Sequence, residues 1–165
     1  MEIDIRKVKQ GEADTLAYIQ TESWKAAFKE IIDDAMLEKC TNIDKARAMY
    51  QRLLDENMGN GYLLTVDNKP HCIAYWDKAR DPELTGKAEL ICIHSLPNNW
   101  HKGFGSKMMD VVLEDIKKSG YSEVVLWVFR NNLRARAFYE GNGFVLNDAT
   151  KSAFDSEEVL YSKVL

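Results

Sequence analysis

A glycine-rich turn, Lys102-Gly103-Phe104-Gly105-Ser106, constrains the fold of this chain most. It lies between an apolar run that ends at Pro97 and a stretch with the apolar spacing of a helix. Glycines adopt backbone angles that a side chain would forbid, and they let the main chain approach a ligand closely. The helix that follows offers unpaired N–H groups and the positive end of its dipole. The order of strand, turn and helix therefore predicts a phosphate-binding site, and Lys102 adds a positive charge at its edge.

The turn matches neither of two common nucleotide-binding motifs. A P-loop continues from its last glycine directly into Lys and then Ser or Thr, whereas Gly105 is followed by Ser106 and Lys107. A dinucleotide-binding fingerprint has a third glycine three residues after the second, and position 108 is Met. The ligand would therefore be of another kind. A plain connection between a strand and a helix is the alternative interpretation of the turn taken alone.

The composition is that of a soluble globular protein, with 45% apolar and 29% charged residues. A length of 165 residues predicts one domain over residues 1–165. No stretch approaches the roughly 18 to 20 apolar residues that span a bilayer. The acidic start, Met1-Glu2-Ile3-Asp4, lacks the apolar core of a signal peptide. We therefore expect a cytoplasmic protein with no membrane partner.

The charge of the chain and its cysteines and histidines argue against a nucleic-acid-binding, a disulfide-bonded or a metal-binding protein. The net charge is −4 and no basic run exceeds two residues, which argues against a nucleic-acid partner. The three cysteines, at positions 40, 72 and 92, are far apart and predict buried or free thiols rather than disulfides. The histidines at positions 71, 94 and 101 lack metal-ligand spacing, so we expect no metal.

Apolar periodicity predicts alternating groups of strands and helices. Strands are expected at residues 3–8, 62–66, 71–76, 88–96, 124–128, 144–146 and 159–164. Helices are expected between residues 12 and 38 with Thr21 as a cap between two of them, from Asn42 to Gly59, from the glycine turn to Gly120, and at 132–140. Residues 67–70 predict a hairpin turn. This order predicts a mixed α/β sheet with helices on both faces.

Three stretches at consistent spacing carry a resemblance to a known family: residues 88–97, Trp100-His101-Lys102-Gly103-Phe104-Gly105, and Asn132-x-x-Ala135-x-x-Phe138-Tyr139-Glu140 followed by Gly143-Phe144. Together with residues 22–28, they resemble the GNAT superfamily of acetyl-CoA-dependent N-acetyltransferases over the whole chain. The resemblance implies an α/β fold with a mixed, mostly antiparallel central sheet flanked by helices. It also implies acetyl-CoA as co-substrate and a primary amine as acceptor.

One position departs from the family pattern. The second stretch is similar to the family's pyrophosphate loop, Gln/Arg-x-x-Gly-x-Gly/Ala, but Trp100 stands where the Gln or Arg falls. Since backbone N–H groups make most of the contacts of such a loop, phosphate binding is still expected. The departure removes one polar side chain from the set of expected contacts.

Acetyl transfer needs a neutral amine, donors for an oxyanion and a proton for the departing thiolate. As the base that takes the proton from the amine, directly or through water, the resemblance implies Glu89, which lies fourteen residues before Gly103. A solvated carboxylate at a strand start is the alternative, and Asp81 and Glu83 are weaker candidates. For the thiolate, Tyr139 matches the family's general acid. Its alternative is a core aromatic residue.

The resemblance also implies the residues that hold the cofactor. The backbone of Ile93 would face the acetyl oxygen, and Ser95 would pair with the pantetheine arm. Further cofactor-binding candidates are His101, Lys102, Gly103, Phe104, Gly105, Ser106, Asn132 and Phe138. Lys102, Lys107, Arg130, Arg134 and Arg136 are cationic candidates for the phosphates, of which one or two can reach.

The acceptor side is the least defined by the sequence. Trp24 and Phe28 either wall an acceptor cleft or belong to the core of the first helices. His94 and Cys92 should face away from Ile93 because strand residues alternate. Since no cysteine sits in a base-activated pair, direct transfer is favoured over a covalent route. The alternatives are a non-catalytic acyl-CoA-binding module and a protein or peptide acceptor in place of a small molecule. A homodimer is compatible with these expectations.

Overall fold

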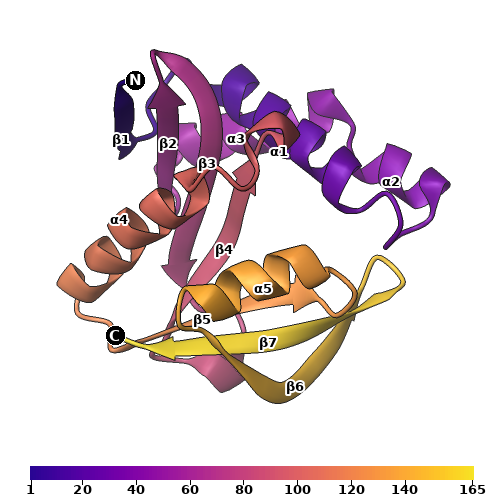
Figure 1. The fold of residues 1–165 in the computed structure, drawn as a ribbon, viewed down its shortest axis with the longest axis vertical. Coiled ribbons are helices and arrows are strands. Elements are labelled where there is room, and N and C mark those ends of the chain that lie inside the picture. Colours follow the sequence, from indigo (N-terminus) through magenta and orange to yellow (C-terminus); the bar gives the residue numbers. More distant parts are fainter.

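The computed structural model, which describes residues 1–165, contains a seven-stranded sheet with the order β1-β2-β3-β4-β5-β7-β6 (Figure 1). The strands are β1 (Ile3–Lys7), β2 (Asn60–Val66), β3 (Lys69–Lys78), β4 (Ala88–Ser95), β5 (Glu123–Phe129), β6 (Val145–Ala153) and β7 (Ser156–Val164). All neighbours are antiparallel except β4 and β5, which are parallel. The predicted mixed, mostly antiparallel sheet is confirmed.

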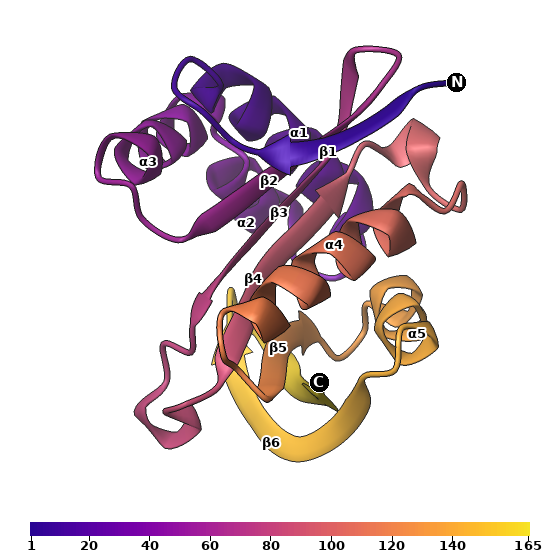
Figure 2. The same cartoon turned by 90° about the vertical axis from the view of Figure 1, so that its left-hand side faces the viewer.

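Helices cover both faces of this sheet. The helices are α1 (Ala13–Ala27), α2 (Asp34–Cys40), α3 (Ile43–Asp55), α4 (Phe104–Lys118) and α5 (Leu133–Gly141). Figure 2 shows α1 and α3 on one side of β2–β4 and α4 on the other. Buried residues of α1 and α3 pack on Leu63, Ile73 and Tyr75, whereas those of α4 pack on the opposite face of the same strands. None of the helices combines the length and the apolar character needed to span a bilayer.

Most local predictions hold at the residue level. The Asn42 side chain caps α3 by accepting a hydrogen bond from Lys45 N at 3.0 Å. The hairpin between β2 and β3 turns at Asp67-Asn68, both with positive φ, as a tight two-residue hairpin turn requires.

Thr21 does not cap a helix, and that prediction is wrong. It is buried in the middle of the continuous helix α1, and its hydroxyl donates to the Tyr18 carbonyl at 3.2 Å. The break between helices falls later, where the Asp33 side chain accepts from Met36 N and caps α2. Thr is common at helix starts, but its hydroxyl can also bond to the preceding turn within a helix.

The sheet opens between β4 and β5. These strands pair only at Ala88 with Val124 and at Glu89 with Val125, and then diverge (Figure 1). On its other edge β4 carries a bulge, because Tyr75 is opposite Cys92 and Trp76 is opposite Leu90, which leaves Ile91 as an extra residue. The edge of β4 that faces β5 therefore has no strand partner beyond Glu89.

Candidate active site

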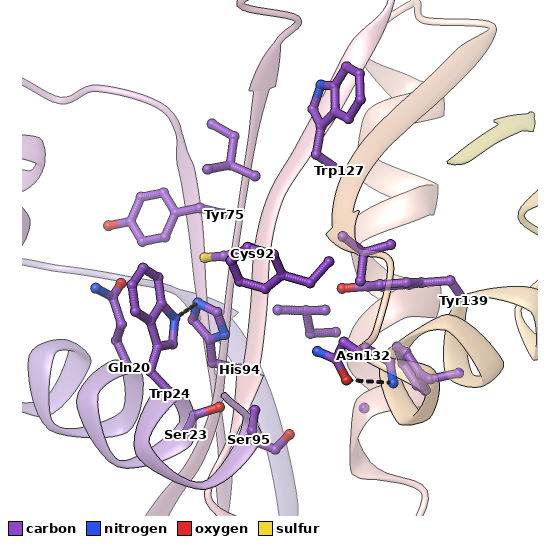
Figure 3. Close-up of a pocket in the computed structure, with 18 of the residues that line it drawn as sticks. Gln20, Ser23, Trp24, Tyr75, Cys92, His94, Ser95, Trp127, Asn132 and Tyr139 are labelled. Carbon is purple, nitrogen blue, oxygen red and sulfur yellow. Dashed lines mark hydrogen bonds between the residues drawn. The ribbon is translucent and has the colours of Figure 1, made fainter. Parts of the chain in front are cut away.

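A cavity of about 1210 Å³ lies at the opening between β4 and β5. Its walls come from α1, α3, β3, β4, the start of α4, β5, α5 and the β6–β7 hairpin. Figure 3 shows side chains of α1 on one side of β4 and side chains of α5 on the other. Residues from both faces of the sheet thus line one continuous space, large enough to hold two ligands together.

The glycine turn forms the start of α4 at one end of this cavity. Gly103 has φ 82°, in the left-handed region, and precedes the first helical residue. No side chain caps this end of the helix, so its first N–H groups are free for a ligand. Gly105 matters for a different reason. A Cβ there would lie 3.1 Å from the Phe138 ring, so its absence lets α5 approach α4.

The candidates around this turn do not all face the cavity. Ile93, Ser95, His101, Gly103, Gly105, Ser106, Asn132 and Phe138 line it. Lys102 is exposed and Phe104 is buried against His71, and neither side chain lines the cavity. Of the cationic candidates, Arg134 lines the cavity, whereas Lys107, Arg130 and Arg136 do not. These residues offer a long ligand an unpaired strand edge and an anion-binding helix start, which fits coenzyme A.

Asn132 and Tyr139 face this space from α5. The Asn132 side chain caps α5 by accepting from Ala135 N at 3.2 Å, as the sequence predicts for a helix start. The Tyr139 hydroxyl points toward β4 in the cavity and makes no hydrogen bond with the protein (Figure 3). Burial raises the pKa of Tyr139 well above its ordinary value, so the phenol keeps its proton and can donate it. Its role as general acid stays a prediction.

Glu89 is neither solvated nor in the cavity wall. The residue is 1% exposed, and Arg80 donates to its carboxylate from N at 3.1 Å, from Nε at 3.2 Å and from Nη2 at 2.7 Å. Arg80 itself lines the cavity. A proton would therefore reach Glu89 only past this guanidinium, and its role as base stays a prediction. Asp81 accepts from Trp127 Nε1 at 2.9 Å, and Glu83 is exposed outside the cavity.

Trp24 and Phe28 wall the cavity as well as packing with other aromatic residues. Their rings lie 5.3 Å apart, and they contact Phe154 and Phe129 respectively. Trp24 Nε1 donates to His94 Nε2 at 3.1 Å (Figure 3), which leaves the His94 ring proton on Nδ1. Burial lowers the pKa of His94 to about 4, so this ring is neutral at pH 7.

Cys92 faces the same side of the sheet as His94, as strand alternation predicts. Burial raises the pKa of its thiol to about 12. A protonated thiol is a poor nucleophile. The cysteine in the cavity wall is therefore not activated for a covalent route.

Sequence reasoning missed Glu158 on β7. This half-buried carboxylate lines the cavity and makes no hydrogen bond or ion pair with the protein. Burial raises its pKa, although Lys151 and Arg80 oppose that shift. One signal was available: Glu158 is in phase with the buried Leu160, so a carboxylate stands on an apolar face of its strand.

Charged side chains of both signs line the cavity. Besides Arg134, they are the carboxylates of Asp77 and Glu158 and the cations of Arg80 and Lys151. Arg80 is paired with Glu89, which does not line the cavity, whereas Glu158 has no partner. Lys151 lies 4.4 Å from the centroid of the Trp127 ring. No group of three or more His, Cys, Asp or Glu side chains is arranged to hold a metal ion.

Comparisons with known proteins agree with this geometry. Residues 21–144 match the model of the acetyltransferase (GNAT) family. The chain is 28% identical over 167 residues to a spermidine N(1)-acetyltransferase of Thermoplasma acidophilum, covering 96% of this chain and 98% of that relative. Among solved structures it resembles the PaiA N-acetyltransferase of Thermoplasma acidophilum in complex with coenzyme A, with TM-score 0.86, 23% identity and full coverage of both chains.

A second similar structure is a GCN5-related N-acetyltransferase from Rhodopseudomonas palustris, with TM-score 0.79 and 14% identity over 100% of this chain and 97% of that one. The structural likenesses show a shared fold, and the family match spans most of the sequence. The chain belongs to the GNAT family of acetyltransferases, whose acyl donor is acetyl-CoA.

Proposed function

We propose that the protein acetylates a small cationic amine of the polyamine class by direct attack within a ternary complex. One observation carries this proposal: a single cavity joins the start of α4 to an aromatic-walled space that the unpaired carboxylate of Glu158 also lines. An acyl donor and an acceptor can occupy it together. The polyamine class is supported by the Glu158 carboxylate, which has no partner in the protein, and by the likeness to a spermidine acetyltransferase.

Acetyl-CoA would supply the acetyl group as a thioester. The residues at the start of α4 would hold its phosphates, and the free edge of β4 at Ile93 and Ser95 would bind its arm through the main chain. The Ile93 N–H would stabilise the oxyanion formed when the amine attacks the carbonyl carbon. As the carbon–sulfur bond breaks, Tyr139 would donate its proton to the thiolate.

The proton released by the amine needs an acceptor. The family resemblance implies Glu89 as the base, acting through water. In this chain that water would pass beside the Arg80 guanidinium, which is paired with Glu89. Glu158 lines the cavity and has no competing partner, so it would bind an ammonium group of the acceptor. Trp24 and Phe28 would wall the alkyl chain. A cytoplasmic location and assembly as a homodimer stay predictions.

A thiol-release assay tests this proposal. Wild-type protein and acetyl-CoA are mixed with spermidine, spermine, putrescine, a monoamine of matched chain length, free amino acids and a basic peptide, and products are identified by mass spectrometry. We expect acetylated polyamine and a lower kcat/KM for the monoamine. Acetyl-CoA binding without any turnover would favour the binding module. Turnover of the peptide alone would favour a protein acceptor.

A further inference from the structure

Arg134 is the only arginine of the chain whose guanidinium forms no hydrogen bond or ion pair with the protein. The others have partners: Arg6 with Glu12, Arg47 with Asp14 and Asp44, Arg52 with Glu56, Arg80 with Glu89, Arg130 with Glu157, and Arg136 with Tyr161 and the Arg130 carbonyl. The donors of Arg134 are therefore available for a ligand.

Trp100 holds this free guanidinium in place. The Arg134 Cζ lies 3.6 Å from the centroid of the Trp100 ring, which is a close cation–π contact. The Trp100 ring is itself fixed, because its Nε1 donates to the Ser95 carbonyl at 3.1 Å. The stack therefore connects α5 to the end of β4 and to the loop that leads into α4.

The position of the stack indicates an anionic ligand. Arg134 and Trp100 line the same cavity as His101, Gly103 and Ser106 at the start of α4. Arg134 is the second residue of α5, near the positive end of that helix dipole, where a cation is unfavourable by itself. An anion bound beside it would interact favourably with the guanidinium and with both helix starts.

We propose that Arg134, stacked on Trp100, binds a phosphate group of the cofactor and supplies from α5 the cationic side chain that the loop before α4 lacks. In the family pattern a Gln or Arg stands at the position of Trp100. Here the indole occupies that position and carries a guanidinium from another element. Arg134 of α5 would thus replace the Gln or Arg side chain that the family pattern has at position 100.

Calorimetric titration with coenzyme A tests this role without relying on turnover. For Arg134→Gln we expect Kd to rise by about tenfold or more, since a charge-assisted bond to a phosphate is lost. Arg134→Lys keeps the charge but not the planar fork, and its loss should be smaller. Lys118→Gln is the matched control, because it removes one positive charge at the far end of α4, where Lys118 pairs with Glu114.

Dephospho-coenzyme A identifies the phosphate. If Arg134 binds the 3′-phosphate, Arg134→Gln and wild type will bind this analogue equally; if it binds the pyrophosphate, the difference will persist. Thermal unfolding of the unliganded variants checks that the fold is intact, as expected for a side chain with no polar partner. Coenzyme A affinity within twofold of wild type for both Arg134 variants would overturn the proposal, and so would an equal loss in Lys118→Gln.

Discussion

Burial decides what each side chain of the site can do. Desolvation raises the pKa of Tyr139, so its phenol stays protonated. It also lowers the pKa of His94 to about 4 and raises that of the Cys92 thiol to about 12, so both side chains are uncharged. At neutral pH the cavity therefore contains a proton donor, a neutral imidazole and an unreactive thiol. This set suits direct transfer, since the cysteine that lines the cavity is not activated as a nucleophile.

Tyr139→Phe should lower kcat by about 10- to 10⁴-fold, the range for losing a general acid. The ring still packs on Phe144 and Tyr161, so coenzyme A affinity and thermal stability should change little. Steady-state kinetics and calorimetry on the same preparation measure both quantities. If binding and turnover fall by the same factor, Tyr139 packs the site but does not donate the proton.

Glu158→Gln should weaken acceptor binding and stabilise the fold at neutral pH. The folded pKa of Glu158 lies above its unfolded value because of burial, so its ionisation costs stability as pH rises through that folded pKa. The variant should therefore have a higher Tm than wild type at pH 7, and the gap should close as the pH falls below the unfolded pKa of a glutamate, about 4.3. KM for a polyamine should rise by about tenfold, with KM for acetyl-CoA unchanged.

Glu157→Gln is the matched control for that prediction. Glu157 is the exposed neighbour on β7, pairs with Arg130 and does not line the cavity. The substitution removes the same charge without altering the acceptor space. An unchanged polyamine KM in Glu158→Gln, or the same rise in Glu157→Gln, would exclude an ammonium-binding role for Glu158.

At the scale of elements, the start of α4 depends on the left-handed conformation of Gly103. An alanine there meets no atom within 4 Å, so its cost is conformational, about 1–2 kcal/mol. Gly120, at the other end of α4, has φ 98° and equally open surroundings. Gly103→Ala and Gly120→Ala should thus lose similar stability in urea denaturation. Only Gly103→Ala should also weaken coenzyme A binding. Equal affinities of the two variants for coenzyme A would contradict phosphate binding at the start of α4.

Local sequence signals predict individual helices, strands and turns well, but they predict poorly how distant strands pair. The Asn42 cap, the Asp67-Asn68 turn and the helix after Gly103 depend on neighbours in the chain, and local sequence patterns revealed them. The Ile91 bulge and the opening between β4 and β5 depend on how distant strands pair. Such pairing is absent from any short window of sequence, because it is set by the whole sheet.

The same limit applies to the site. The motifs indicated Gly103, Gly105, Asn132 and Tyr139, which all line the cavity. They did not show that Arg80 would pair with Glu89, or that Arg134 would stack on Trp100 from another helix. Glu158 escaped notice because only the fold brings β7 to the cavity.

At the scale of the whole molecule, the sheet is two parts joined by a short ladder. β1–β4 and β5–β7 share only the pairs at Ala88 and Glu89, and the cavity fills the opening beyond them. The packing of α4 and α5 and the aromatic contacts at the end of α1 with Phe129 and Phe154 also join the two parts. A ligand in the opening would add contacts to the free edge of β4. Binding should therefore stabilise the molecule and protect that edge.

Coenzyme A at 100 times its Kd should add about 2.7 kcal/mol to the free energy of unfolding. For a chain of this length that corresponds to a rise in Tm of roughly 5–10 °C. Hydrogen exchange should slow most at Ile93 and Ser95 of β4 and in the first turn of α4, because those N–H groups gain partners, whereas those of Cys92 and His94 already face β3. Adenosine diphosphate, which lacks the pantetheine arm, should protect the start of α4 but leave β4 unchanged. Protection spread evenly over β1–β3, or protection of β4 by adenosine diphosphate alone, would show that the arm does not lie along the opened strand.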